Sequence, residues 1–217
     1  MIGDALRRRR KRAEELRYWR DRKAAEGELG HGHYEAIFTG LAGLDREFYD
    51  CKEVLDLGCG PRGSLNWATN ARRRVGLDPL ARDYRALGTE AHPMEYVTAA
   101  AEDMPFNDES FDVVTSFNSL DHVDDLDRTI TEIKRVLRPG GHLVLVVEVG
   151  HEPTWSEPQT IEWDVCTRFE PELETVHSAA YERGGDNMYD GAWRGERFDH
   201  DDARVRPGLL VGVLRRR

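Results

Sequence analysis

A short apolar run that ends in a cluster of glycines constrains this chain more than any other stretch. Residues 54–57 read Val-Leu-Asp-Leu and lead directly into Gly58, Gly60 and Gly63. Branched and leucine residues before a glycine-rich turn are typical of a buried strand, and glycine lets the backbone approach a ligand closely. Because Ser64 follows, we expect a helix to begin there and to present its free N–H groups to that ligand. The pattern predicts a nucleotide-binding turn between a strand and a helix.

Two nucleotide cofactors fit the spacing of these glycines. Gly58, Gly60 and Gly63 match the G-x-G-x-x-G pattern that binds the pyrophosphate of NAD. Asp56, however, stands two residues before the first glycine, where a carboxylate repels a pyrophosphate. S-adenosylmethionine has no phosphate and carries a cationic amino group that the same carboxylate attracts. The residues therefore favour S-adenosylmethionine, and an NAD-dependent oxidoreductase stays the weaker alternative.

Beyond residue 53, apolar runs alternate with helical patterns, as in a parallel sheet with right-handed crossovers. Strands are predicted at residues 54–58, 74–78, 96–99, 111–117, 142–149, 173–181 and 209–214. Helices are predicted at 125–137 and 159–169, and an exposed loop or hairpin at 184–206. We expect an α/β fold.

The N-terminal segment differs in charge from the rest of the chain. Residues 1–25 hold ten Lys or Arg against four Asp or Glu, although the whole chain has a net charge of −10. Residues 4–26 lack Gly and Pro and predict a surface helix, and residues 33–41 predict a second, short one. We expect residues 1–45 to form a basic helical arm or lid on a core of residues 46–217, within one domain.

The composition narrows the classes of partner and location. The basic arm could pair with the acidic body, with an anionic substrate or with RNA, while the acidic total argues against nucleic acid as the general partner. No run approaches the roughly 20 apolar residues that span a bilayer, and no apolar core region follows the basic start, so we expect a cytoplasmic protein. Cys51, Cys59 and Cys166 are scattered, and His31 and His33 lack further ligands at suitable spacing, so no disulfide or metal site is predicted.

Asp78 carries the next piece of chemistry. It ends the second predicted strand, 20 residues after Gly58, where open α/β sheets place an acid that binds ribose hydroxyls. The alternative is an ordinary turn aspartate before Pro79. The glycine turn upstream favours the ribose role.

Five motifs stand in a common register along the chain. They are V-L-D-L-G-C-G-P-R-G at 54–63, V-G-L-D at 75–78, A-E-D-M-P-F at 101–106, F-D-V-V at 111–114 and R-V-L-R-P-G-G at 135–141. In order and spacing the chain resembles the class I S-adenosylmethionine-dependent methyltransferases. The resemblance implies a Rossmann-like sheet of seven strands in the order 3-2-1-4-5-7-6, with strand seven antiparallel and helices on both faces.

The resemblance also implies where the cofactor is bound. The cofactor-binding residues would be Asp56, Gly58, Cys59 and Gly60 at the methionine end, Asp78 and Pro79 at the ribose, Ala101, Glu102 and Asp103 at the adenine, and Asn118. Two positions depart from the family pattern. Arg62 replaces the usual third glycine, so the turn could widen or present a guanidinium to the pocket. Ala100 replaces an acid that often reaches adenine, which leaves adenine recognition to Ala101 and Glu102.

Candidate catalytic residues follow the fourth strand. By position, the resemblance places Asn118 and His122 beside the reacting groups, and a histidine can accept a proton near neutral pH. Positioning of donor and acceptor alone is the alternative, because alignment removes much of the barrier to methyl transfer. Tyr34, Trp155 and Trp163 are aromatic candidates for the acceptor site. We expect a methyltransferase acting on oxygen or nitrogen of a small molecule; a non-catalytic S-adenosylmethionine-binding protein is the alternative.

Overall fold

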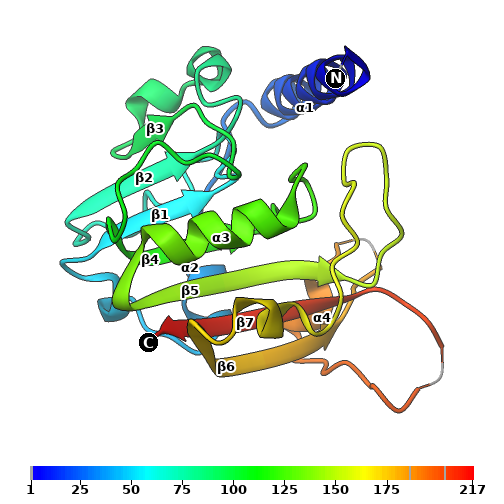
Figure 1. Cartoon of the computed structure of the whole chain (residues 1–217). Coiled ribbons are helices and arrows are strands. Elements are labelled where there is room, and N and C mark those ends of the chain that lie inside the picture. Colours follow the sequence, from blue (N-terminus) through cyan, green and yellow to red (C-terminus); the bar gives the residue numbers. More distant parts are fainter. Residues whose placement is uncertain (1, 186, 203) are drawn as a thin grey trace.

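The computed structural model describes residues 2–185, 187–202 and 204–217. One sheet contains the strands β1 (Glu53–Leu57), β2 (Arg73–Leu77), β3 (Glu95–Val97), β4 (Phe111–Phe117), β5 (Leu137–Val149), β6 (Leu173–Glu182) and β7 (Gly208–Arg216). Their order is β3-β2-β1-β4-β5-β7-β6, and β7 runs antiparallel to both of its neighbours (Figure 1). The predicted α/β fold class and strand order are confirmed.

The helices agree less completely with the sequence-based predictions. They are α1 (Ile2–Glu26), α2 (His33–Phe38), α3 (Leu126–Val136) and α4 (Asp190–Trp193), with short 3-10 turns at Gly40–Ala42, Glu47–Tyr49, Asp83–Leu87, Thr89–Ala91 and Val165–Phe169. The helices predicted near the N-terminus and at 125–137 are confirmed. Among the described residues, no helix is both long and apolar enough to cross a membrane.

The helix predicted at 159–169 was wrong, because only its last five residues, Val165–Phe169, turn as a short 3-10 helix. The backbone before them bonds to other loops instead of to itself. The N–H of Gln159 donates to the carbonyl of Asp121 at 3.2 Å, and the carbonyl of Ile161 accepts from Gly150 at 2.9 Å. The segment therefore serves as a bridge between the loops that follow β4 and β5.

The helix predicted to begin at Ser64 was also wrong, since residues 60–67 form consecutive turns. The Ser64 hydroxyl does not cap a helix but donates to the carboxylate of Asp56. Gly63 has a φ of +73°, and an added Cβ there would lie 2.2 Å from Asn66 Nδ2. The chain thus leaves β1 through a tight, side-chain-bonded loop with no helix N-terminus facing the ligand.

Apolar side chains alternate across the sheet and pack two hydrophobic cores. In β4, Val114 belongs to the core beneath α3, whereas Val113 belongs to the core that contains α2 and Tyr49. This period of two is the sheet's own geometry. Figure 1 shows α3 and α2 on opposite sides of the sheet, so the helices cover both faces.

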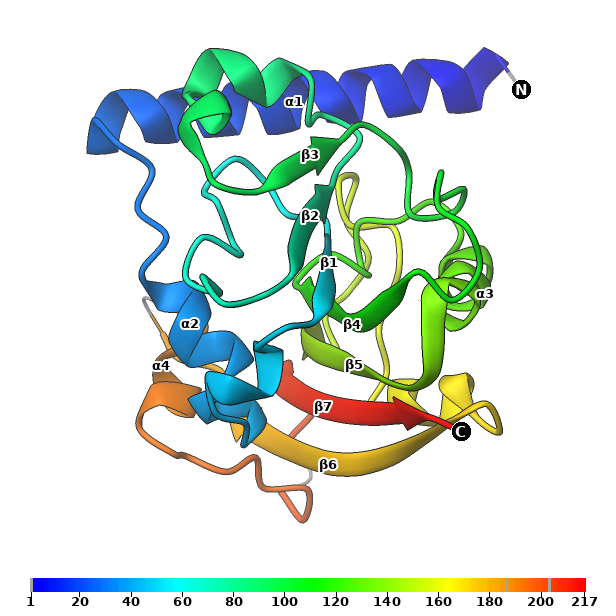
Figure 2. The same ribbon diagram turned by 90° about the vertical axis from the view of Figure 1, so that its left-hand side faces the viewer.

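Helix α1 runs across the carboxyl ends of β1, β2 and β3 (Figure 2). Its partly buried Leu16 and Trp19 pack against Leu80, Tyr84 and Leu87, which form a third, small core. The helix is also held by charge, because Arg7 Nη2 lies 2.6 Å from Asp124 Oδ1. The basic arm therefore pairs in part with the acidic body.

Candidate cofactor and acceptor site

A cavity of about 630 Å³ lies between α1 and the carboxyl ends of β1, β2 and β4. This is the place where open α/β sheets bind ligands, and the volume lies within the usual range for small-molecule sites. Eight of the residues predicted from the sequence line it: Gly58, Gly60, Asp78, Pro79, Ala101, Glu102, Asn118 and His122. The structure thus brings together side chains from four separate loops.

The turn at Gly58 forms the floor of the cavity. Gly58 has a φ of +65°, and an added Cβ would lie 2.4 Å from the Cβ of Ser119. Ser119 is itself fixed, since its hydroxyl donates to the carbonyl of Leu57 at 2.8 Å. Glycine is therefore required here both by backbone conformation and by the close approach of the loop after β4.

Asp78 is buried at the end of β2 and lines the same cavity. Its Oδ1 accepts from the N–H of Leu80 at 2.8 Å, and its Oδ2 accepts from the N–H of Gly60 at 3.2 Å. Burial raises the pKa of Asp78 to about 6, although the two backbone donors favour the ionised form. The carboxylate consequently joins the glycine turn to β2 and retains lone pairs for hydroxyl donors.

Three of the predicted cofactor contacts lie off the cavity wall. Asp56 is 2% exposed, and its carboxylate accepts from the hydroxyls of Ser64 and Thr115, the latter at 2.6 Å. Burial raises the pKa of Asp56 to about 7. Cys59 packs its sulfur against Gly76, where an added Cβ would lie 2.5 Å away, and Asp103 points to solvent. Asp56 and Cys59 therefore support the turn from behind.

The Glu102 side chain accepts hydrogen bonds from the loop after β4. Its Oε1 accepts from the N–H groups of Asp124 and Asp125, at 2.6 and 3.2 Å. Ala100, Ala101 and Glu102 still line the cavity. One oxygen of the Glu102 carboxylate is thus engaged by the loop after β4 and does not replace the acid that is missing at Ala100.

Asn118 turns the chain at the end of β4 with a φ of +45°, a value that side-chain-bearing residues rarely adopt. Its Oδ1 accepts from the N–H of Glu148 at 3.0 Å. Its Nδ2 donates to the hydroxyl of Tyr189 at 2.9 Å and approaches Met188 Sδ at 3.1 Å. The amide therefore holds β5 and the 188–189 loop in place while the residue lines the cavity.

Aromatic rings form one wall of the cavity. Tyr34, Phe117 and Tyr189 line it, with ring centroids 5.8 Å apart for Tyr34 and Phe117 and 5.0 Å apart for Phe117 and Tyr189. Of the aromatic candidates from the sequence, Tyr34 alone lines the cavity. Trp155 is 45% exposed, and Trp163 packs against Phe198 with ring centroids 4.4 Å apart.

Helix α1 closes the cavity with Glu15, Tyr18 and Trp19. An added Cβ at Gly60 would lie 3.2 Å from the Trp19 ring, so the helix sits directly on the glycine turn. Arg62 points away from the cavity and binds Glu26 through both guanidinium nitrogens at 2.8 Å. The residue that departs from the family turn is thus an anchor for the C-terminal end of α1.

His122 lies where the loop after β4 meets the loop after β5. Its Nε2 is 3.7 Å from Glu157 Oε1, and both residues line the cavity. Behind them, Asp121 is 3% exposed, and its Oδ2 is 3.7 Å from His151 Nε2. Burial raises the pKa of Asp121. The predicted candidate His122 is therefore one member of a group of four.

Sequence reasoning missed Tyr18, Tyr189, Glu157 and His151. The first belongs to a helix whose pattern gave only a thin apolar stripe, and the others belong to the C-terminal third, which carries no motif. Single charged or aromatic residues of this kind are common in loops and on helix surfaces and carry no sequence signal. Only the pairing of distant loops brings Tyr18, Tyr189 and Glu157 to one cavity and places His151 beside Asp121 behind it.

Comparisons with known proteins agree with this geometry. Residues 55–145 match the family model described as a methyltransferase domain. The tocopherol O-methyltransferase of Arabidopsis thaliana is 32% identical over 146 residues, which are 61% of this chain and 42% of that protein. The ubiquinone/menaquinone biosynthesis C-methyltransferase UbiE of Idiomarina loihiensis is 39% identical over 77 residues, which are 36% and 29% of the two chains. The matched regions span less than half of these relatives.

Solved structures share the fold over more of the chain. An S-adenosylmethionine-dependent methyltransferase from Mesorhizobium loti has a TM-score of 0.58 at 20% identity and covers 77% of this chain and 92% of its own. A methyltransferase solved in complex with the Haloferax volcanii activator Trm112 has a TM-score of 0.61 at 22% identity, with coverage of 94% and 96%. Residues 55–145 thus match a methyltransferase domain, and the sheet has the strand order expected for the class I S-adenosylmethionine-dependent methyltransferases.

Proposed function

We propose that this chain binds S-adenosylmethionine in the cavity beneath α1 and methylates an oxygen atom of a small acceptor that carries an aromatic or other flat apolar group. The observation that carries the proposal is the buried Asp78 carboxylate. It lies at hydrogen-bond distance from the Gly60 amide and lines a cavity of about 630 Å³. A carboxylate beside a glycine turn suits a ligand in which ribose hydroxyls lie next to an amino-acid group, as they do in S-adenosylmethionine.

The residues fit S-adenosylmethionine better than NAD. After the glycine turn the chain forms further turns instead of a helix, so the N–H groups and dipole that stabilise a pyrophosphate are missing there. Asp56 lies behind this turn and Asp78 lines the cavity beside it, and an ionised carboxylate at either position opposes an anion. In this arrangement Asp56 acts through the turn that it holds. The N–H groups of Gly58 and Gly60 donate to Leu77 and Asp78, so the backbone of the turn meets the methionine end through its close approach.

When bound, S-adenosylmethionine supplies an electrophilic methyl group on a positively charged sulfur. The protein's task is then to hold the acceptor in line with that group and to exclude water. Tyr34, Phe117 and Tyr189 offer ring faces that attract a cation. Asn118 fixes Tyr189 through its amide, so its role is positioning of this aromatic wall.

Two observations favour oxygen as the acceptor atom of the methyl group. The sequence favours an oxygen or nitrogen acceptor because His122 can take up a proton, and His122 lines the cavity. One relative is by its name an O-methyltransferase and the other a C-methyltransferase. Oxygen is the one acceptor atom that agrees both with proton uptake by His122 and with the name of a relative.

We further propose that residues 1–45 act as the lid of the site, in a single domain of residues 1–217. Trp19 covers the turn at Gly60, and Arg62 ties Glu26 to the core. Ligand entry then requires α1 to move away from the strand ends. The cytoplasm is the compartment we propose for such a small-molecule enzyme.

The proposal is tested first by calorimetry of the full chain with S-adenosylhomocysteine, S-adenosylmethionine and NAD. We expect micromolar binding of the first two and none of NAD; tight NAD binding alone would refute the cofactor assignment. Production of S-adenosylhomocysteine is then measured with a panel of phenols, catechols and hydroquinones. Cofactor binding without turnover on any hydroxylated acceptor would favour the non-catalytic alternative.

A further inference from the structure

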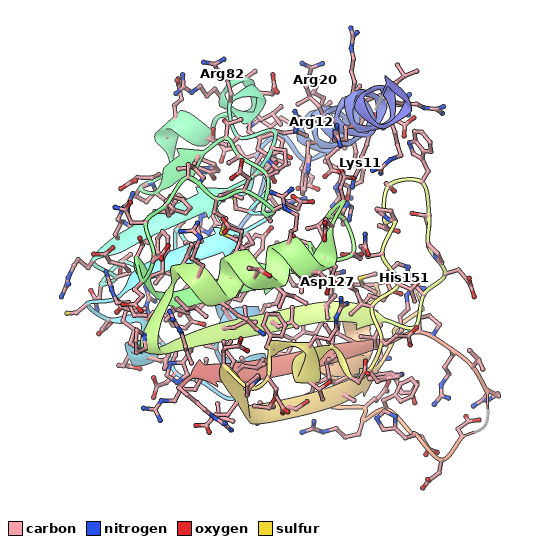
Figure 3. The ribbon with its side chains drawn as sticks, in the orientation of Figure 1. Lys11, Arg12, Arg20, Arg82, Asp127 and His151 are labelled. Carbon is pink, nitrogen blue, oxygen red and sulfur yellow. The ribbon has the colours of Figure 1, made fainter. Side chains whose placement is uncertain are left out.

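The group of four at the acceptor end consists of metal-ligand side chains. A carboxylate oxygen of Asp121, a ring nitrogen of His122 and a carboxylate oxygen of Glu157 all lie within 4.8 Å of one another. His151 adds a fourth donor, with Nε2 3.7 Å from Asp121 Oδ2. Figure 3 places His151 on the loop that leaves β5. The four side chains come from two loops that the backbone bond from Gln159 to Asp121 holds together.

Hydrogen bonding leaves this group with an excess of lone pairs. His151 Nδ1 lies 2.9 Å from the carbonyl oxygen of Glu152, so Nδ1 carries the proton. In the neutral ring, Nε2 then presents a lone pair to the Asp121 carboxylate. Asp121 Oδ1 and His151 Nε2 are both buried and have no hydrogen-bond partner among the described residues. Unpaired buried groups of this kind are costly, and a cation between them removes the cost.

Protein cations do not fill that role in the part of the chain that the structure describes. Neither Asp121 nor Glu157 forms an ion pair with Lys or Arg there; histidine is their sole basic neighbour within 4 Å. Lys11 approaches the same loop, but its Nζ donates to the backbone carbonyl of His122. Glu148, close by, differs because Arg183 Nε lies 3.2 Å from its Oε1. The two unpaired carboxylates would neutralise one divalent ion.

We propose that Asp121, His122 and Glu157 bind a divalent transition-metal ion, with the unprotonated Nε2 of His151 beside Asp121 as a further donor. Imidazole with carboxylate favours Zn²⁺ or Mn²⁺ over Mg²⁺ and Ca²⁺, which prefer oxygen alone. The separation of 3.7 Å between His122 Nε2 and Glu157 Oε1 is close to the roughly 3.4 Å between neighbouring ligands of one tetrahedral ion with bonds of about 2.1 Å. Small side-chain movements complete the site.

This inference rests on the proposed function and narrows its substrate class. Because His122 and Glu157 line the cavity, the open positions of the ion face the acceptor. An acceptor hydroxyl bound there would release its proton to water more readily. With the ion in place, His122 therefore serves as a ligand, and water takes the proton that His122 would accept in the metal-free site. Its oxygen would then form the bond to the methyl carbon while the electron pair of the carbon–sulfur bond stays on sulfur. The acceptors selected are those with a chelating oxygen, such as a catechol or an ortho-hydroxyketone.

The test uses the full chain, treated with a chelator and then dialysed free of it. Mn²⁺ is titrated and its unbound signal is followed by electron paramagnetic resonance, with Zn²⁺ as a competitor. We expect one ion per chain and at least tenfold weaker binding in Asp121→Asn and His122→Gln. Glu152→Gln removes a neighbouring carboxylate and His200→Ala a distant exposed histidine, and both controls should bind as the parent does.

Binding of S-adenosylhomocysteine by calorimetry and far-UV circular dichroism are recorded for every variant, so loss of folding is recognised. His122→Gln changes a partly exposed side chain and remains informative if Asp121→Asn unfolds. The metal inference is overturned if the parent binds no Mn²⁺ or Zn²⁺ at millimolar concentration, or if controls and ligand variants weaken alike. Such a result with intact cofactor binding leaves the proposed function standing, whereas metal binding without cofactor binding refutes the proposed function itself.

Discussion

Replacement of Asp78 tests the cofactor assignment most directly. Asp78→Ala removes a carboxylate that already accepts from Gly60 and Leu80 and that we assign to the ribose hydroxyls. Loss of hydrogen bonds to a charged acceptor costs about 1.5–3 kcal/mol, or about a 10- to 150-fold rise in Kd. The assay is calorimetry with S-adenosylhomocysteine at pH 7.5. Asp83→Asn, an exposed acid of the following turn, is the matched control.

The same carboxylate predicts a pH dependence that a merely structural aspartate would not give. Burial raises the pKa of Asp78 to about 6, and hydroxyl donors bind the ionised form. Affinity should therefore be constant above pH 7 and fall about tenfold for each pH unit below 6. Asp78→Asn should abolish this part of the profile. An Asp78→Ala variant that binds within twofold of the parent, or a profile that Asp78→Asn leaves unchanged, would refute the ribose role.

The stability of the ligand-free protein should fall as pH rises, whereas its affinity for the ligand should rise. A carboxyl whose pKa is higher in the folded chain than its ordinary 3.8 favours folding while it stays protonated. As pH rises from about 4 to 6, the unfolded chain loses this proton first, and about 3 kcal/mol of stability is lost. Urea unfolding of the parent and of Asp78→Asn at pH 5 and pH 8 measures the part of this loss that falls between those two values, about 1.5 kcal/mol.

Three further variants probe the turn and the helix above it. Gly58→Ala should abolish cofactor binding, because the new Cβ would lie 2.4 Å from Ser119 Cβ; calorimetry measures it, and binding within tenfold of the parent would contradict the close approach. Arg62→Ala breaks the bidentate pair with Glu26 and should speed ligand dissociation at least fivefold in stopped-flow experiments, with Arg82→Ala as the exposed control. Deletion of residues 1–26 should reduce ligand retention more than folding, and a chain that unfolds outright would contradict the lid.

The strands could be predicted from the sequence because their signal is local. The runs at 111–117 and 142–149 are rich in branched and aromatic residues, and β4 and β5 contain them. The absence of a helix after the glycine turn could not be predicted, because it depends on residues far away in the sequence. Ser64 is an ordinary helix cap by type, yet Asp56 takes its hydroxyl, and Thr115 completes that buried group from β4.

The candidate site likewise contains residues that local motifs predict and residues that only distant contacts bring together. Gly58, Gly60 and Asp78 lie next to strand ends, so their motif spacing is enough to bring them together at one edge of the sheet. Glu157 and His151 are placed by residues 150–164, a stretch without regular structure, and only its bonds to the loop after β4 bring them to His122. A pattern search that requires fixed spacing has no means of joining Asp121 to Glu157.

Helix α1 touches both ends of the cavity, and under the proposed function this would couple the two ligands. Its middle lies on the glycine turn through Trp19, whereas Arg7 reaches Asp124 at the end that we assign to the acceptor. The backbone N–H of Asp124 is in turn held by Glu102, which we assign to the adenine end. A cofactor that contacts Glu102 would therefore fix the residue on which the first turns of α1 depend. Because one helix makes both contacts, we expect cofactor binding to favour closure over the acceptor.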